Sequence, residues 1–423
     1  MKVAYINTVF EVKSTGRTYL ELKNYLSDNG HEVQVHYGRG NSKIENSFLI
    51  QSKFSYYFHN LLSRLFGLEG YFSFFATKRL VRRLKRFNPD IIHIGSMHGH
   101  YLHLPTLFKY LNKVQKPTFI TTHDCWSFTG NCSHYNSVGC SKFETGCYKC
   151  PVKKEYPSSY TFDCSKKLYK EKKKGLCGLK NLNIICVSEW MKTQVKRSFL
   201  KDKDIFVNYN WINTNVFKPL DKNERTDFRK ENGFSDNDFV IIAVSSIWGE
   251  GTPRFEDLKK LISKLKDNQK LVVIGSMKKE LSTNERVTFI PFVSDIKLLA
   301  KYYSMADVFV HFSIEDTFGK VIAEAQACGT PAIVYNATAC SEIARIGNGY
   351  VCEPRDVDQV YKMIEKLSKM DKAGLTSDRI VRAEKTSQTL NKNTRIKNLL
   401  KLYKQAIENK ISLTSKEIRD REI

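Results

Sequence analysis

Hydrophobic residues fall along this chain in short runs of five to eight positions, and longer stretches with a wider apolar spacing separate the runs. Several of the runs are apolar throughout instead of alternating with polar residues, which is typical of strands covered on both faces of a parallel sheet. We expect strands at residues 3–7, 32–37, 90–95, 118–122, 182–187, 239–245, 271–275, 287–292, 307–312 and 331–335.

The stretches between these runs have the spacing of amphipathic helices. Tyr19, Leu22 and Leu26, for example, follow one another at intervals of three and four residues, which places them on one helix face. Strand and helix alternate over about 1–200 and again over about 220–385. This alternation predicts an α/β protein with two Rossmann-like, doubly wound domains that face a cleft.

The boundary between the two series is marked by an Asn-rich stretch that closes on Pro219, and such a composition is typical of a linker. The end of the chain is charged and aperiodic, which predicts a frayed tail. The expected organisation is an N-terminal domain over 1–205, a linker over 206–219, a second domain over 220–385, a helix over 386–411 that returns to the N-terminal domain, and a tail over 412–423.

The composition is that of an ordinary globular protein with a strong positive charge. No run approaches the ~20 apolar residues of a membrane-spanning helix. The first residues lack a small-residue cleavage site and are interpreted as a strand, not a secretory signal, so we expect a cytoplasmic protein. Lys and Arg number 68 against 44 Asp and Glu, a net charge of +24. This excess favours an anionic partner: nucleic acid, an anionic lipid surface or a phosphate-bearing small molecule.

Two carboxylates stand out in residues 313–331, which run from a strand end through a helix to a Gly-Thr-Pro turn. Asp316 and Glu324 are eight positions apart. If the helix begins at Thr317 or Phe318, Asp316 becomes its N-cap and Glu324 lies near its second turn, so both can face one cleft. The alternative is a capping Asp and a solvated helix Glu. The backbone amides then left to bind an anion are those of Phe318, Gly319 and Lys320.

This stretch resembles the E-x7-E signature of retaining glycosyltransferases of the GT-B fold, family four, group 1 type. In that family the first acid contacts the transferred sugar and the second holds the ribose hydroxyls of a nucleotide-sugar donor. The resemblance implies these roles for Asp316 and Glu324. The first acid is Asp here instead of Glu, and Glu315 with a shifted spacing is an alternative; the Phe318-Gly319 pair favours Asp316. The family retains configuration without a clear covalent intermediate and without a catalytic metal.

The N-terminal domain carries two further pieces of this resemblance. A Ser-Thr-Gly-Arg sequence ending in Gly16 and Arg17 follows the first strand. A Gly at this position lets the backbone approach a pyrophosphate. Taken by itself, the sequence is also explained by a β-to-α turn with a capping Ser or Thr. With residues 30–33 and 37–40 it resembles the polysaccharide-building members of the family. In residues 121–130, just past a strand end, the resemblance implies that His123 lines the donor sugar and the reaction centre; the alternative is a structural histidine.

The second domain departs from the family at its first strand. An Arg and a Lys commonly neutralise the donor diphosphate there, whereas residues 245–254 hold Arg254 as their only cation. Arg254 or Lys320 is the expected substitute. The resemblance implies retaining transfer of a sugar from a nucleotide-diphosphate sugar to a lipid-linked or growing surface polysaccharide, such as capsule, with the donor mainly on the second domain. The alternatives are a nucleotide-sugar epimerase of the same architecture and a zinc-containing nucleic-acid-binding protein.

Four of the eleven cysteines lie close together at 132–150, in an insert over about 125–152. The last two have the C-x2-C spacing that lets two thiolates bind one tetrahedral metal, and the first two can complete the set. Four thiolates leave no open position, so the prediction is a structural zinc site. The alternatives are ordinary thiols, or His134 in place of one member. The predicted ligands are Cys132, Cys140, Cys147 and Cys150, and the predicted small core residues are Cys125, Cys164, Cys177, Cys186, Cys328, Cys340 and Cys352.

An aromatic-rich block at 54–75 precedes a helical pattern at 77–86 in which basic residues surround an apolar stripe. Basic residues beside aromatic ones suit an anionic membrane surface or a lipid-phosphate acceptor. We therefore expect peripheral contact at the inner face of the plasma membrane and no nucleic acid. The alternative is that the block is core and the charges are a solvated face. A second basic run, at 166–174, is interpreted as a solvated helix face.

Overall fold

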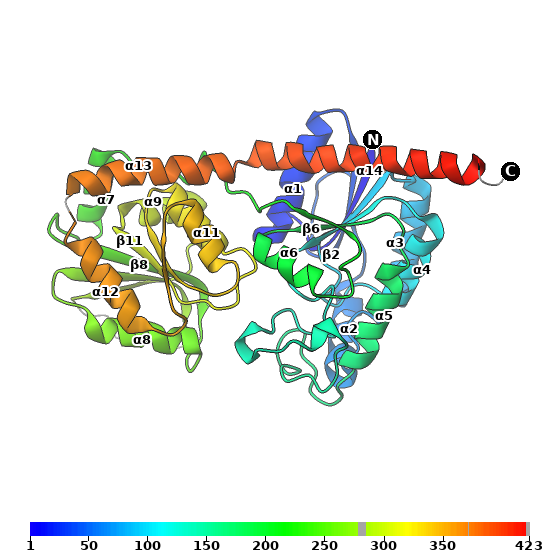
Figure 1. Cartoon of the computed structure of the whole chain (residues 1–423), viewed down its shortest axis with the longest axis horizontal. Coiled ribbons are helices and arrows are strands. Elements are labelled where there is room, and N and C mark those ends of the chain that lie inside the picture. Colours follow the sequence, from blue (N-terminus) through cyan, green and yellow to red (C-terminus); the bar gives the residue numbers. More distant parts are fainter. Residues whose placement is uncertain (278–284, 371, 420–423) are drawn as a thin grey trace. The chain divides into compact units, whose positions relative to one another are not determined.

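The computed structural model describes residues 1–277, 285–370 and 372–419, which form two compact units. The first unit comprises Met1–Asn208 and the chain from Ile396 onward, and the second comprises Tyr209–Arg395. Each unit contains one parallel sheet flanked by helices (Figure 1). The predicted α/β architecture with two doubly wound parallel sheets is therefore confirmed.

The first unit has a seven-stranded sheet in the order β3-β2-β1-β4-β5-β6-β7, and every neighbouring pair is parallel. The strand order reverses between β1 and β4. In an open α/β sheet, the expected ligand position is therefore beyond the carboxyl ends of these two strands. The strands are β1 (Lys2–Val9), β2 (Glu32–Arg39), β3 (Ser47–Leu49), β4 (Ile91–Ile94), β5 (Thr118–Thr122), β6 (Leu182–Cys186) and β7 (Asp204–Val207). The helices are α1 (Lys13–Asp28), α2 (Lys53–Phe66), α3 (Phe74–Phe87), α4 (Leu104–Val114), α5 (Ser165–Cys177) and α6 (Glu189–Lys196).

The last helix, α14 (Lys392–Arg419), contributes to the first unit from Ile396 onward. Tyr403 is fully buried and its hydroxyl shares a hydrogen bond with His93 Nδ1 of β4. The Tyr403 ring packs edge-on against Phe119 of β5, with 4.8 Å between ring centroids. The C-terminal helix is thus part of the core of this unit. Of the expected tail at 412–423, the part to Arg419 continues α14, and residues 420–423 lie outside the described residues.

The second unit has a six-stranded parallel sheet in the order β10-β9-β8-β11-β12-β13. Its order reverses between β8 and β11. The strands are β8 (Phe239–Trp248), β9 (Gln269–Met277), β10 (Val287–Ile290), β11 (Val308–His311), β12 (Ala332–Tyr335) and β13 (Tyr350–Cys352). The helices are α7 (Lys222–Glu231), α8 (Pro253–Lys264), α9 (Ile296–Met305), α10 (Lys320–Ala327), α11 (Cys340–Ile346), α12 (Val357–Ser368) and α13 (Lys372–Thr389).

Three strands were not predicted from the hydrophobic pattern: β3, β7 and β13. Each lies at the edge of its sheet. Their residues are mostly half-buried, unlike those of the central strands β4 and β5, which are buried throughout. An edge strand is covered on fewer sides, so it does not need the continuous apolar run on which the prediction relied.

Candidate functional site

The loop between β11 and α10 holds the first predicted carboxylate. Helix α10 begins at Lys320, and its N-cap is Gly319 in the left-handed region at φ 78°. The prediction that Asp316 caps this helix is therefore wrong. Asp316 instead accepts a hydrogen bond from His311 Nε2 at the end of β11, and its own N–H donates to Thr338 Oγ1 across 3.2 Å. Asp316 is thus fixed by the ends of two neighbouring strands.

The second carboxylate, Glu324, lies in the second turn of α10, as predicted. Its exposed fraction is 9%, so the alternative of a solvated helix glutamate is wrong. Burial, and secondarily the Glu324 charge, raise the pKa of Tyr303 well above its usual value. The same two causes raise the pKa of Cys328. A carboxylate held this far from solvent is typical of a ligand-binding or structural role.

The remaining predicted donor residues of the second unit are Phe318, Gly319 and Lys320 at the start of α10, and Arg254 in the first turn of α8. Phe318 is buried and Lys320 is half-buried. A Cβ added to Gly319 would lie 2.7 Å from Ile322 Cδ1 and 3.9 Å from Asp316 Oδ2, so the backbone approaches the Asp316 carboxylate closely. Burial lowers the pKa of Arg254, and the charge of Asp316 opposes that shift. Arg254 and Asp316 are therefore electrostatic neighbours within this unit.

The first unit places Gly16 inside the first turn of α1, which begins at Lys13. A Cβ at Gly16 would lie 3.2 Å from the Phe10 carbonyl carbon, so this Gly allows the helix to pack on the loop after β1. Arg17 is exposed. Two non-Gly residues of this loop, Glu11 and Lys13, have positive φ values of 67° and 58°. Such backbone strain is often found where a loop is shaped for a ligand.

His123 follows β5 directly and lines a hollow at the carboxyl ends of β4 and β5. Two residues that sequence reasoning did not assign a role lie in the same hollow. His98 Nε2 donates to Asp124 Oδ2 across 2.6 Å, and Asp124 Oδ1 accepts the Trp126 N–H at 2.8 Å. The sequence feature that could have identified His98 is the group of histidines that follows β4, the strand at which the strand order reverses. The hollow is lined by Gly95, Ser96, Met97, His98, Ile120, Thr121, Thr122, His123, Asp124, Trp126 and Ser127.

The pair carries opposite charges that stabilise each other. Burial acts to lower the pKa of His98, but the Asp124 charge and hydrogen bond outweigh it and raise that pKa above 6.5. Burial acts to raise the pKa of Asp124, but His98 outweighs it and lowers that pKa to about 2. A carboxylate–imidazole pair of this kind can orient a hydroxyl group or hold a proton beside it.

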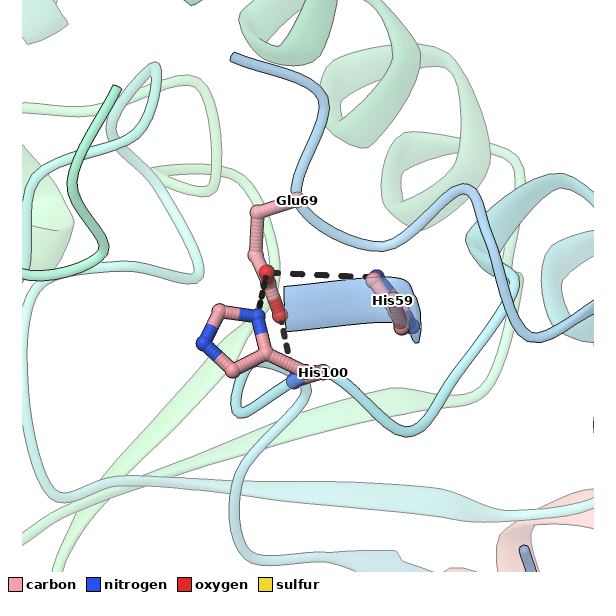
Figure 2. Close-up of side chains that lie close together, drawn as sticks. All are labelled: His59, Glu69 and His100. Carbon is pink, nitrogen blue, oxygen red and sulfur yellow. Dashed lines mark hydrogen bonds and ion pairs between the residues drawn. The ribbon is translucent and has the colours of Figure 1, made fainter. Parts of the chain in front are cut away.

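A buried cluster of His59, Glu69 and His100 supports the loop that carries His98 (Figure 2). Glu69 Oε1 accepts the backbone N–H groups of Gly99 and His100, at 2.8 and 2.7 Å. Glu69 Oε2 accepts His100 Nδ1–H at 2.5 Å. Although these side chains could in principle bind a metal ion, the carboxylate oxygens already have donors that fix the loop. We interpret the cluster as an internal anchor.

The four predicted zinc ligands lie on one segment of the first unit. Cys132 is buried, and Cys140, Cys147 and Cys150 are half-buried beside the same hydrophobic core. Among the cysteines predicted as small core residues, Cys177 is exposed and Cys164 is half-buried. The prediction is wrong for Cys177, because it lies at the end of α5, where the helix leaves the core. The core prediction is confirmed for Cys125, Cys186, Cys328, Cys340 and Cys352, all of which are buried.

Comparison with known protein families divides the chain at the same place as its fold. The family model Glycosyltransferase Family 4 matches residues 15–216, and Glycosyl transferases group 1 matches residues 224–395. The two models together account for most of the chain. The chain belongs to the glycosyltransferases of these two groups and has their GT-B fold.

Curated relatives match parts of the chain. N-acetyl-alpha-D-glucosaminyl L-malate synthase of Bacillus anthracis is 26% identical over 42% of this chain and 48% of its own. Capsular polysaccharide biosynthesis glycosyltransferase CapM of Staphylococcus aureus is 31% identical over 44% of this chain and 52% of its own. The putative colanic acid biosynthesis glycosyl transferase WcaC of Escherichia coli is 35% identical over 23% of this chain and 24% of its own. The chain spans about half the length, or less, of these relatives.

Solved structures share the fold over nearly the whole chain. Sucrose-phosphate synthase from Thermosynechococcus elongatus has a TM-score of 0.67 at 16% identity, covering 96% of this chain and 99% of its own. Anabaena Alr3699/HepE in complex with UDP has a TM-score of 0.66 at 14% identity, covering 96% and 100%. At these identities the likeness concerns the fold alone.

Proposed function

We propose that this chain transfers a sugar from a nucleotide-diphosphate sugar to a hydroxyl of a lipid-linked or growing surface polysaccharide, with retention of the anomeric configuration. The observation that carries the proposal is the pair of carboxylates around α10, one held by His311 and one buried in the second turn. The names of the CapM and WcaC relatives support a role in polysaccharide synthesis. HepE, which shares the fold, is described with UDP-glucose.

The second unit is the proposed donor site. As the bond to the leaving diphosphate breaks, negative charge develops on the diphosphate and positive charge on the sugar. The amides at the start of α10, after Gly319, and the side chains of Arg254 and Lys320 are the proposed diphosphate contacts. Asp316 orients the sugar hydroxyls, and Glu324 holds the ribose. No protein nucleophile and no catalytic metal are part of the proposal.

The first unit is the proposed acceptor site. The hollow at the ends of β4 and β5 brings His98, His123 and Asp124 together. His123 contacts the reacting sugar in this proposal, and the His98–Asp124 pair positions acceptor hydroxyls. The pair suits this task because its hydrogen bond and buried backbone contacts hold both side chains in place before any ligand binds.

The surface of α2 and α3 is the proposed contact with an anionic membrane. The aromatic block was considered as possible core, but much of α2 is exposed: Phe54 has an exposed fraction of 80%, and Phe75 at the start of α3 one of 79%. The stripe on α3 that includes Leu80 and Leu84 is buried, which leaves the basic residues outside. No helix among the described residues is long and apolar enough to cross a bilayer. The exposed set on α2 is Phe54, Tyr57, Phe58, Leu61, Leu65 and Phe66, and the exposed basic set on α3 is Lys78, Arg79, Arg82, Lys85 and Arg86.

Apolar and basic side chains on two consecutive helices, with no acidic residue in either, suit an interface that binds anionic headgroups and inserts shallowly. A lipid-linked acceptor would be presented at such a surface. This contact therefore supports the acceptor class proposed above.

A nucleotide-sugar panel tests the proposed function. Each nucleotide sugar is scored first for thermal stabilisation of the chain, because a donor that binds the folded state raises Tm. The stabilising donor is then incubated with and without a lipid-linked saccharide, and the product anomer is determined by NMR. Transfer only with acceptor supports the proposal. Conversion of the donor alone would instead indicate the epimerase, and a steeply salt-dependent DNA affinity without donor binding would indicate the nucleic-acid-binding alternative.

A further inference from the structure

The segment between β5 and α5 carries the four clustered cysteines and has little regular structure. Its only helical elements in the described chain are two short 3-10 turns, Asn136–Val138 and Lys142–Glu144. It nevertheless packs on the core, where Phe143 and Cys132 are buried. A long segment without strands or helices needs another source of order, such as cross-links or a bound ion.

The thiols of this segment lie near one another. The thiols of Cys132 and Cys150 are close enough to influence each other's ionisation. Cys147 lies within electrostatic range of the other three, Cys132, Cys140 and Cys150. The four thiols are therefore electrostatic neighbours within one short stretch of the sequence. All four are free thiols.

A backbone N–H group points at one of these sulfurs. The Gly130 N–H donates to Cys147 Sγ across 3.0 Å. Hydrogen bonds from backbone amides stabilise sulfur in its thiolate form, the form that binds metals.

A fully buried lysine beside the cysteines is an independent observation. Lys172 of α5 has an exposed fraction of 0%, and its Nζ lies 3.6 Å from the centroid of the Trp126 ring and donates to the Trp126 carbonyl. Among the residues that the structure describes, no carboxylate is within ion-pair distance of it. Cys147, Cys132, Asp124 and Glu69 are its electrostatic neighbours. A buried ammonium requires a compensating negative charge.

We infer that Cys132, Cys140, Cys147 and Cys150 bind one structural zinc ion, and that Lys172 is its buried counter-ion. Each thiol releases one proton to solvent on binding, so Zn²⁺ with four thiolates carries a net charge of about −2, which a neighbouring ammonium partly neutralises. Binding would draw the four sulfurs to about 2.3 Å from the ion. The ion would hold the segment that carries Asp124 and Trp126 against α5, outside the proposed reaction itself.

Metal analysis of the full chain, purified without chelators, is the first test. We expect about one zinc per chain, and substitution by cobalt should give the visible absorption of tetrahedral cobalt with thiolate-to-metal charge transfer. Cys150→Ser should lose the metal, whereas Cys177→Ser, an exposed cysteine outside the segment, should keep it. A wild-type chain without zinc that also fails to bind cobalt, or a Cys132–Cys150 disulfide found by mass spectrometry, would overturn the inference.

The role of Lys172 has its own test, in case the cysteine variants do not fold. Lys172→Met keeps most of the side-chain volume and removes the charge. Its zinc affinity, measured by competition with a chromophoric chelator, should fall about 10–100-fold, as for other residues that support metal ligands. Lys173→Met, on the exposed side of the same helix, is the matched control. Equal zinc affinity in both variants and the wild type would refute the counter-ion role.

Discussion

His98 and Asp124 follow neighbouring strands, β4 and β5, and their side chains meet in a hydrogen bond of 2.6 Å between Nε2 and Oδ2. Tyr156 adds its hydroxyl at 3.2 Å from His98 Nδ1, so both imidazole nitrogens have partners. The pair lies beside His123, the histidine that the sequence singled out. The first unit thus contains a preorganised group of polar side chains where its strand order reverses.

The His98–Asp124 pair should make stability depend on pH. The folded pKa of His98 is above its usual 6.5, so its contribution is fully present below pH 6.5 and is lost as pH rises through the folded value. The folded pKa of Asp124 is lowered from 3.8 to about 2, so its contribution is present above pH 3.8 and is lost as pH falls towards 2. The pair therefore stabilises most between these limits. The other ionisable groups around the pair are Glu69, Lys172, Tyr156 and His134.

The measurement is urea unfolding of the wild type and Asp124→Asn from pH 5 to pH 8. The difference in unfolding free energy should be largest near pH 5 and shrink as pH rises above 6.5. Asp28→Asn, an exposed change at the end of α1, should show no such trend. A difference that is constant over the whole range would contradict a charged pair.

Glu324→Gln should weaken donor binding. Removal of a charged hydrogen-bond acceptor costs about 1.5–3 kcal/mol, which corresponds to roughly a 10–100-fold loss of affinity. The fold should survive, because Gln has nearly the same shape. The Kd of the best nucleotide sugar is measured by calorimetry, with Glu231→Gln on the exposed end of α7 as the control. Unchanged affinity in Glu324→Gln would remove the ribose role.

Gly319→Ala should destabilise the second unit and weaken donor binding. The position has φ 78°, and an added Cβ would lie 2.7 Å from Ile322 Cδ1. Gly233→Ala is a matched control because Gly233 has φ 80° with nothing within 4 Å of the added atom. Both variants carry the backbone strain of about 1–3 kcal/mol, and only the first adds a contact. In urea unfolding, Gly319→Ala should therefore have a lower free energy of unfolding than Gly233→Ala. The reverse order would count against a close contact between the added Cβ and Ile322.

Phe54→Ser and Phe58→Ser should each reduce binding to anionic vesicles. Burial of one aromatic side chain contributes about 1.5–3 kcal/mol, so each variant should lower the partition coefficient about tenfold or more. Phe292→Ser, an exposed phenylalanine of the second unit, is the control. Vesicles with phosphatidylglycerol should bind the wild type, and added salt should weaken that binding. Absence of wild-type binding at low salt would refute the membrane contact.

The central strands could be predicted from the sequence because burial on both faces requires continuous apolar runs such as those of β4 and β5. Glu324 could be placed in the second turn from its spacing alone. The N-cap could not be predicted, since Asp316 and Gly319 are both acceptable before a helix, and the sequence does not reveal the left-handed backbone of Gly319. His98 was not predicted because its role depends on its hydrogen bond with Asp124. The pairing of β4 with β5 brings these two side chains together, and this pairing cannot be read from the sequence.

Because α14 packs in the first unit, the order of synthesis determines which unit can complete its fold first. Tyr403 completes a cluster with Tyr5, His93 and Phe119, residues from the opening part of the chain. As the polypeptide emerges from the ribosome, the second unit is finished before that gap in the first is closed. Until α14 is synthesised, the nascent first unit therefore has part of its interior uncovered. A fragment that stops at Asn208 would stay in that unfinished condition.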